Sequence, residues 1–431
     1  MTPQQQVLTF AKKYQLDLDQ NPLDRLVDDL LSDMKIGLTQ ANPKSLKMLP
    51  TYMAPPQIIP QNQKIIVIDA GGTNFRSCLV EFDEEGEPQI SHFHHMLMPG
   101  VDREYGKQEF FATIAKSVAH LKNQARQIGF CFSYAMEMTP EHDGKVLNFA
   151  KEIKASEVIG SLVGHELKQA LIAQGWNSDL VVTMVNDTTS ALLAGASRAI
   201  DGTKYSSQLG FILGTGINTA YLETRSKQKP SRQIIVCEAG AFDKVKMSQF
   251  DCQFDATTQA PGTYLIEKMA GGGYVGAVAS RALRQACQDR LFDSDEVNSR
   301  LSELSELTLP EINQFLQKPW NDQNRLSLAL AGACQADRDK LWLLCDLFVE
   351  RSAQLASGVV AAGGVKTGQG QSPTEPVGVL CEGTTLYATA GLYQRFASYL
   401  DQELVQKRGL YYQLIKIDNA NIIGAALATF C

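Results

Sequence analysis

Several features that would place this chain in a particular class of protein are missing from its sequence. Its nine cysteines are scattered, odd in number and free of any Cys-x-x-Cys pair, which argues against a disulfide framework or a zinc site. No apolar run approaches the roughly 20 residues of a membrane span, and residues 1–6 are too polar to begin a signal peptide. The net charge of −7 lacks the basic excess with which proteins bind nucleic acids. We therefore expect a reduced, cytoplasmic chain with no membrane and no nucleic-acid partner.

The composition that remains is typical of a globular protein. Hydrophobic residues make up 44% and charged residues 20% of the 431 residues, so the chain is long enough for two domains with separate cores. A small phosphorylated ligand is compatible with the negative net charge, because a local group of backbone amides needs no global positive charge.

A Gly-Gly turn joins two predicted strands near the start of the chain. Residues 65–68 are consecutive β-branched residues, typical of a strand buried on both faces, and residues 77–82 form the next predicted strand. Uncovered backbone amides at the turn could bind an anion, and Asp69 at the strand end could hold a divalent ion or its water shell. An ordinary tight hairpin is the alternative. The candidate phosphate-binding residues are Gly71, Gly72, Thr73, Asn74 and Arg76.

A second turn of the same plan follows about 145 residues downstream, where Gly214, Thr215 and Gly216 separate two further predicted strands. Two such units facing each other would bind a phosphate chain from both sides. The pair predicts a duplicated α/β unit with a nucleotide in the cleft. No Gly-x-x-x-x-Gly-Lys-Ser/Thr motif is present, which excludes a P-loop kinase as the simple alternative.

Polar residues follow two more predicted strands. Ser133 lies at the end of the strand over 128–134, and Asn186 and Asp187 follow the strand over 180–185. A carboxylate at the end of a buried strand is well placed for proton transfer, although Asp187 could also be a helix cap together with Asn186. Helices are predicted over 109–127 and 157–174.

Taken in order, these motifs resemble the hexokinase family of the actin-like ATPase superfamily, from about residue 21 to the end. The resemblance implies two actin-like, ribonuclease H-like α/β domains with a nucleotide and sugar cleft between them. The small domain would comprise residues 62–188 plus the C-terminal helix 419–431. The large domain would comprise 1–61 and 189–418, with a helical insertion.

The same resemblance implies residue roles. Asp187 would accept the proton of the sugar hydroxyl, and Lys151 would orient the sugar and offset charge on the transferred group. Gly383 and Thr384 would join the two glycine turns in binding ATP, and Asp69 would hold Mg²⁺ directly or through water. The reaction would be transfer of the γ-phosphoryl group of ATP to the 6-hydroxyl of a hexose, most simply glucose, as in the first step of glycolysis. The implied sugar-binding residues are Ser133, Asn186, Asp187, Asn218, Glu238 and Glu267.

Three alanines depart from the family pattern around the sugar. Ala135 stands where a proline is usual, Ala150 where a threonine is usual and Ala239 where a tryptophan is common. Two alternatives therefore stay open: a kinase for a different acceptor sugar, and a catalytically impaired regulator that binds sugar. We also expect sugar to draw the two domains together, because the implied sugar ligands come from both.

Overall fold

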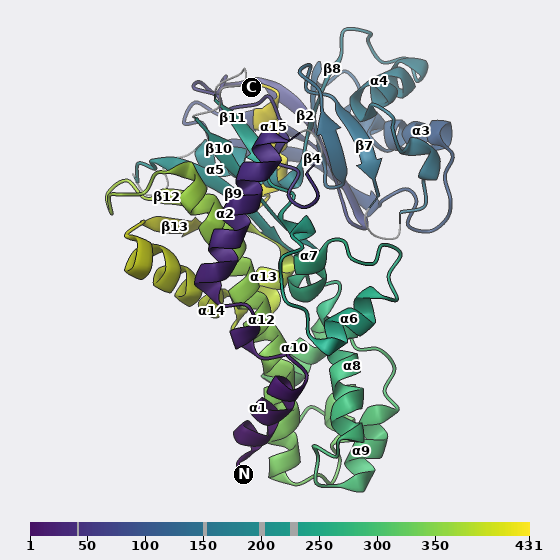
Figure 1. Ribbon diagram of the computed structural model, residues 1–431. Coiled ribbons are helices and arrows are strands. Elements are labelled where there is room, and N and C mark those ends of the chain that lie inside the picture. Colours follow the sequence, from purple (N-terminus) through teal and green to yellow (C-terminus); the bar gives the residue numbers. More distant parts are fainter. Residues whose placement is uncertain (41–42, 150–152, 198–202, 225–231) are drawn as a thin grey trace.

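The computed structural model describes residues 1–40, 43–149, 153–197, 203–224 and 232–431. It has two large β-sheets that lie side by side at one end of the molecule, and helices that extend away from them at the other end (Figure 1). The N-terminus lies at the helical end and the C-terminus beside the sheets.

The first sheet has five strands in the order β4-β3-β2-β5-β8. The predicted hairpin is its centre: β2 and β3 pair antiparallel, and β5 and β8 continue the sheet in parallel. Helices α3 and α4 lie against each other in this part of the molecule, and β6 and β7 form a separate two-stranded sheet. The bounds are β2 (Lys64–Gly71), β3 (Asn74–Phe82), β4 (Pro88–Leu97), α3 (Lys107–Ser117), β5 (Gln127–Phe132), β6 (Ala135–Met138), β7 (Gly144–Asn148), α4 (Val163–Ala173) and β8 (Val181–Val185).

The second sheet has six strands in the order β1-β11-β10-β9-β12-β13. Apart from β1 at its edge, its strands follow the plan of the first sheet: an antiparallel hairpin, a third antiparallel strand on one side and two parallel strands on the other. The internal repeat predicted from the two glycine turns is therefore confirmed. The bounds are β1 (Leu49–Pro50), β9 (Ser207–Leu213), β10 (Ile217–Glu223), β11 (Gln233–Val236), β12 (Val377–Glu382) and β13 (Tyr412–Ile415).

The six-stranded sheet is buried on both faces, so alternate residues of β10 enter different cores. Tyr221 packs into the core that contains α12, whereas Ala220 and Leu222 pack into the core between the sheets. Helices α5 (Asp187–Ala196) and α15 (Ala420–Ala428) fill this second core. Helix α5 lies on β9 and β12, α15 lies on β2 and β5, and the two helices cross each other between the sheets.

Small residues allow this crossing. A Cβ atom at Gly424 of α15 would lie 1.9 Å from the carbonyl oxygen of Ser190 of α5, so the two backbones are in direct contact. The helix whose first residue is Asp187 is thereby held at a set distance from both sheets. The division of the chain into domains at residues 188 and 189 stays a prediction.

The other helices pack against α12 or against its neighbours; α12 is the 33-residue helix that runs from the helical end to the six-stranded sheet (Figure 1). The bounds of these helices are α1 (Pro3–Lys13), α2 (Leu23–Thr39), α6 (Gln249–Asp255), α7 (Leu265–Ala270), α8 (Val275–Gln288), α9 (Asp295–Ser302), α10 (Leu309–Gln317), α11 (Arg325–Ala329), α12 (Gln335–Thr367), α13 (Thr384–Ala388) and α14 (Leu392–Leu400).

Two predicted helices are shorter than expected. The helix predicted over 109–127 is α3, which ends at Ser117; a short 3₁₀ turn follows, and Asn123 then takes a left-handed φ of 67°. The helix predicted over 157–174 is α4, which begins only at Val163 because Gly160, with φ of 84°, turns the chain after another 3₁₀ turn. A left-handed residue does not continue a right-handed helix, so α3 cannot extend through Asn123 and α4 cannot begin before Gly160.

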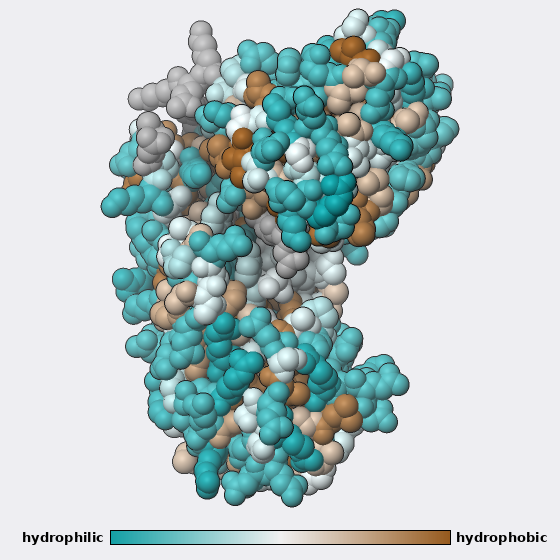
Figure 2. Space-filling model, turned by 90° about the vertical axis from the view of Figure 1, so that its right-hand side faces the viewer, coloured by the Kyte–Doolittle hydropathy of each residue, from teal (hydrophilic) through white to brown (hydrophobic). Residues whose placement is uncertain are grey.

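The surface in Figure 2 is mainly hydrophilic, with hydrophobic residues in small separate groups. Within the described ranges, no helix is long and apolar enough to cross a membrane.

Candidate active site

A cleft of about 640 Å³ brings the predicted site residues together. Its wall is built by the two glycine turns, the ends of β5 and β8, and the segments that follow β11 and β12. Every predicted site residue that the structure describes lines it; Lys151, together with Ala150, lies outside the described residues. The predicted residues in the wall are Asp69, Gly71, Gly72, Thr73, Asn74, Arg76, Ser133, Asn186, Asp187, Gly214, Thr215, Gly216, Asn218, Glu238, Glu267, Gly383 and Thr384.

Asp69 lies near the end of β2, opposite Arg76 of β3 in the register of the hairpin. The Nη1 atom of Arg76 is 3.4 Å from Oδ2 of Asp69, a weak contact, while Oδ1 is buried and has no hydrogen-bond partner among the described residues. Burial raises the pKa of Asp69 from 3.8 to about 6, against the opposing effect of Arg76. A buried, unsatisfied carboxylate oxygen beside a phosphate-type turn fits the oxygen ligands that Mg²⁺ prefers.

The first glycine turn is supported by the end of β5. The Ser133 N–H donates to the carbonyl of Ala70, and the Tyr134 hydroxyl donates to the carbonyl of Gly72 at 2.7 Å. Tyr134 lines the cleft and was not among the predicted site residues. The sequence signal that could have identified Tyr134 was its position directly after Ser133.

Asn186 and Asp187 share the N-terminus of α5. Asn186 is the N-cap, because its Oδ1 accepts the backbone N–H of Thr188 at 2.9 Å and also the Thr188 hydroxyl. Asp187 is the first helical residue, and its Oδ1 also accepts the Thr188 N–H, at 2.8 Å. Both residues line the cleft, so the capping role and exposure to a ligand coexist. The positive end of a helix dipole stabilises an anionic side chain at this position.

The second glycine turn packs closely against two other parts of the wall. A Cβ atom at Gly216 would lie 2.1 Å from Oε2 of Glu267, and that same oxygen accepts the N–H of Ile217 at 3.2 Å. On the other side, the Thr385 hydroxyl donates to the carbonyl of Gly214 at 2.8 Å. Any side chain at position 216 would displace Glu267, so the glycine turn and this carboxylate form one unit.

Glu238 has a left-handed backbone, with φ of 53°, at the start of the short turn η5 (Ala239–Ala241). The Asn218 amide nitrogen donates to its Oε1 at 3.2 Å, and Asn218 Oδ1 accepts the N–H groups of Thr219 and Ala239. Burial, together with the smaller effects of the Glu267 and Asp187 charges, raises the pKa of Glu238 from 4.5 to about 7. Glu238, Glu267 and Asp187 all line the cleft, so several carboxylate acceptors are available to a ligand with several hydroxyls.

Several residues of the wall were missed by sequence reasoning. Tyr264 precedes α7, Tyr274 donates its hydroxyl to Oε1 of Glu267 at 3.3 Å, and Asn421 comes from α15. Tyr264 and Tyr274 flank Glu267 in the sequence, which was a weak signal for them. No local sequence feature indicated that Asn421 would line the cleft.

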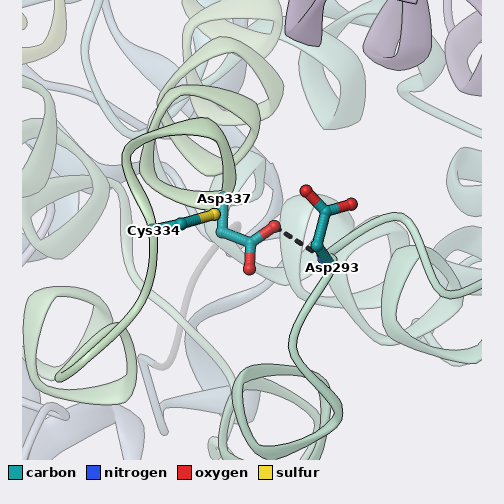
Figure 3. Close-up of side chains that lie close together, drawn as sticks. All are labelled: Asp293, Cys334 and Asp337. Atoms are coloured by element: carbon teal, nitrogen blue, oxygen red, sulfur yellow. Dashed lines mark hydrogen bonds between the residues drawn. The ribbon is translucent and has the colours of Figure 1, made fainter.

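A cluster of possible metal ligands lies far from the cleft, at the start of α12, and consists of Asp293, Cys334 and Asp337 (Figure 3). Asp337 accepts the backbone N–H of Asp293 at 2.6 Å. The buried ammonium of Lys340 lies 2.7 Å from Asp293 Oδ1 and 3.5 Å from Asp337 Oδ1. A cation is thus already supplied by the chain, and we assign no metal to this cluster.

Comparisons with known proteins give matches in family models, in sequence and in fold. Residues 10–197 and 208–431 each match a protein-family model described as hexokinase. The chain is 25% identical to Hexokinase-5 of Oryza sativa subsp. japonica over 413 residues, covering 89% of this chain and 80% of that protein. It is 27% identical to Hexokinase-1 of Schizosaccharomyces pombe over 438 residues, covering 94% and 87%. A solved hexokinase from Schistosoma mansoni complexed with glucose matches over 100% of both chains, with a TM-score of 0.83 at 23% identity. The expected two-domain α/β fold of the actin-like type is thereby confirmed.

Proposed function

We propose that this chain, which belongs to the hexokinase family of ATP-dependent sugar phosphotransferases, transfers the γ-phosphoryl group of ATP to the 6-hydroxyl of a hexose, most simply glucose. The product would be a hexose 6-phosphate, as in the first step of glycolysis. The observation that carries the proposal is the shared cleft, whose wall contains both glycine turns, the carboxylates of Glu238 and Glu267, and Asp187.

The sugar end would hold the acceptor by hydrogen bonds. Ser133, Asn186, Asn218, Glu238 and Glu267 line the cleft, and carboxylates accept hydrogen bonds from hydroxyls strongly. Asp187 would accept the proton of the 6-hydroxyl as the sugar oxygen attacks the γ-phosphorus. Lys151, carried over from the family resemblance, would orient the sugar and offset the negative charge.

The phosphate end would hold the donor. Backbone amides of the two glycine turns and the side chains of Thr73, Thr215 and Arg76 would orient the phosphate chain. Asp69 would hold Mg²⁺ directly or through water, as its unpartnered Oδ1 suggests, and the bound ion would neutralise phosphate charge.

A second depression of about 490 Å³ is lined mainly by residues 387–394, which follow Gly383 and Thr384 in the chain. Tyr387 and Tyr393 line it and stack on each other, with ring centroids 5.5 Å apart, and Lys416 Nζ lies 4.7 Å from the Tyr387 ring centre. An aromatic wall beside the predicted ATP-binding residues suits a nucleoside, which supports ATP as the donor.

Sugar binding would also close the cleft, because Ser133 belongs to the five-stranded-sheet part and Glu238 and Glu267 to the other part. Closure would exclude water, which otherwise competes as acceptor. Small-angle scattering would show compaction with saturating sugar, and an unchanged radius of gyration would contradict closure.

The decisive experiment is an ADP-release assay with MgATP and a panel of glucose, mannose, fructose and glucosamine, run on the unchanged chain and on Asp187→Ala. We expect turnover of at least one sugar and a loss of several orders of magnitude in the variant, in line with a lost general base and misplaced acceptor. The preferred sugar would decide between glucose and another acceptor. Sugar binding without turnover would instead favour the regulator that the alanine departures left open.

A further inference from the structure

Two bulky residues with left-handed backbones lie in the wall of the cleft. Among the described non-glycine residues with positive φ, Glu238 and Tyr264 line it, with φ of 53° in each. A left-handed conformation is unfavourable for a tyrosine and persists only where the surrounding structure holds it. Each of the two residues starts a short helix, η5 and α7, and the N–H of Ile266 in α7 donates to the carbonyl of Phe242 after η5.

A buried ion pair holds the loop that leads into Tyr264. Lys268 of α7 pairs with Asp255, and both side chains are about one-tenth exposed. Lys268 Nζ also donates to the Thr258 hydroxyl at 3.0 Å and to the Ala260 carbonyl at 2.8 Å. The other oxygen of Asp255 accepts the Gly262 N–H at 2.7 Å. The loop between α6 and α7 is therefore built to present Tyr264 in its unfavourable conformation.

Tyr264 lies close to the carboxylates proposed to bind the sugar. Tyr264 lines the same cleft as Glu238 and Glu267. Burial raises the pKa of its phenol to about 12, and the charges of Glu238 and Glu267 act in the same direction. Tyr264 is partly buried and forms part of the wall of the cleft. A rigid aromatic ring at this place limits the room around the hydroxyls that the two carboxylates would hold.

We propose that Tyr264 determines acceptor specificity: its ring excludes hexoses that carry a bulky substituent on a hydroxyl held by Glu238 or Glu267. This inference rests on the proposed function, because it concerns the acceptor sugar of the same cleft. Tyr264 acts here as a barrier and takes no part in proton transfer.

The test compares the preferred hexose with its 2-acetamido, 3-O-methyl and 4-O-methyl derivatives. The ratio of kcat/KM for each derivative to that for the parent hexose is measured for the unchanged chain, Tyr264→Ala and Tyr264→Phe, and binding without ATP is measured by calorimetry. We expect Tyr264→Ala to raise the ratio at least tenfold for one derivative, and Tyr264→Phe, which keeps the ring, to leave every ratio within twofold. Tyr264→Gly serves if the alanine variant does not fold, since glycine adopts this backbone conformation freely.

Tyr52→Ala is the matched control, because Tyr52 has φ of 60° and is partly buried but does not line the cleft. It should leave the ratios unchanged. Ratios that stay within twofold in Tyr264→Ala, while the unchanged chain phosphorylates hexoses, would overturn this inference alone. An unchanged chain that neither binds nor phosphorylates any sugar would overturn the proposed function and the inference with it.

Discussion

The crossing of α5 and α15 offers a quantitative test of the fold through Gly424→Ala. In a helix interior this substitution normally stabilises, by about 1 kcal/mol, because alanine has the higher helix propensity. At Gly424 the added carbon would lie 1.9 Å from the Ser190 carbonyl oxygen, whereas such atoms normally approach to about 3.3 Å. The helices would have to separate by about 1.4 Å to make room.

Separation of this size loses packing along the whole crossing, since a gap of about 1 Å removes up to half of a contact's dispersion energy. Overpacking of a well-packed core destabilises by about 1–3 kcal/mol, and here the obstacle is backbone, which cannot rotate away. We expect Gly424→Ala to lower the free energy of unfolding by about 3 kcal/mol in spite of its better helix propensity. Because α5 begins with Asp187, turnover should fall as well.

Gly364→Ala in α12 is the matched control. It is also a helical glycine, but its Cβ would lie 3.6 Å from the Leu404 side chain, an ordinary contact. This variant should be unchanged or more stable by about 0.5–1 kcal/mol. Urea unfolding followed by circular dichroism measures the free energy of unfolding of both variants. The comparison is valid if this free energy falls with urea concentration at the same slope in both. A Gly424→Ala variant as stable as Gly364→Ala would refute the close crossing of the helices.

Three further predictions concern charged groups. The pKa of Glu238 is raised from 4.5 to about 7 in the folded chain, so between these pH values the folded state keeps a proton that the unfolded state has lost. The stability of the unchanged chain therefore falls as the pH rises from 4.5 to about 7. Chemical unfolding between pH 5 and 8 should show Glu238→Gln gaining stability relative to the unchanged chain, by on the order of 2 kcal/mol. Lys268→Met should cost about 3–5 kcal/mol by leaving a buried carboxylate unpaired, whereas Lys204→Met, which breaks an exposed pair, should change stability by less than about 0.5 kcal/mol; equal losses would contradict this account. Asp69→Asn should lower kcat by about 10²-fold or more and raise the Mg²⁺ concentration needed for half-maximal turnover. A magnesium titration that shows neither effect would contradict the assignment of Asp69 as a Mg²⁺-binding residue.

Most of the cleft was predictable because its motifs are short and contiguous. The turns around Gly71 and Gly214 join strands whose β-branched and apolar residues specify a hairpin locally, and these hairpins lie at the centres of the two sheets. The ends of α3 and α4 were predicted less well. Asn123 and Gly160 take left-handed conformations that residue type permits but does not require.

The sequence alone determined the duplicated hairpin plan, the family and the polar residues at the strand ends, because each depends on neighbouring residues and on the order of motifs along the chain. The tertiary structure determined which other residues these polar residues contact. Glu267, which locally is an ordinary first-turn charge, contacts the backbone at Gly216 and Ile217, about 50 residues away. The buried ion pair between Asp255 and Lys268 holds the loop from which Tyr264 lines the cleft. The pKa of Glu238 is raised by burial and by neighbouring carboxylates that only the folded chain brings together. Desolvation and long-range contact are properties of the packed chain, and no local pattern of residues encodes them.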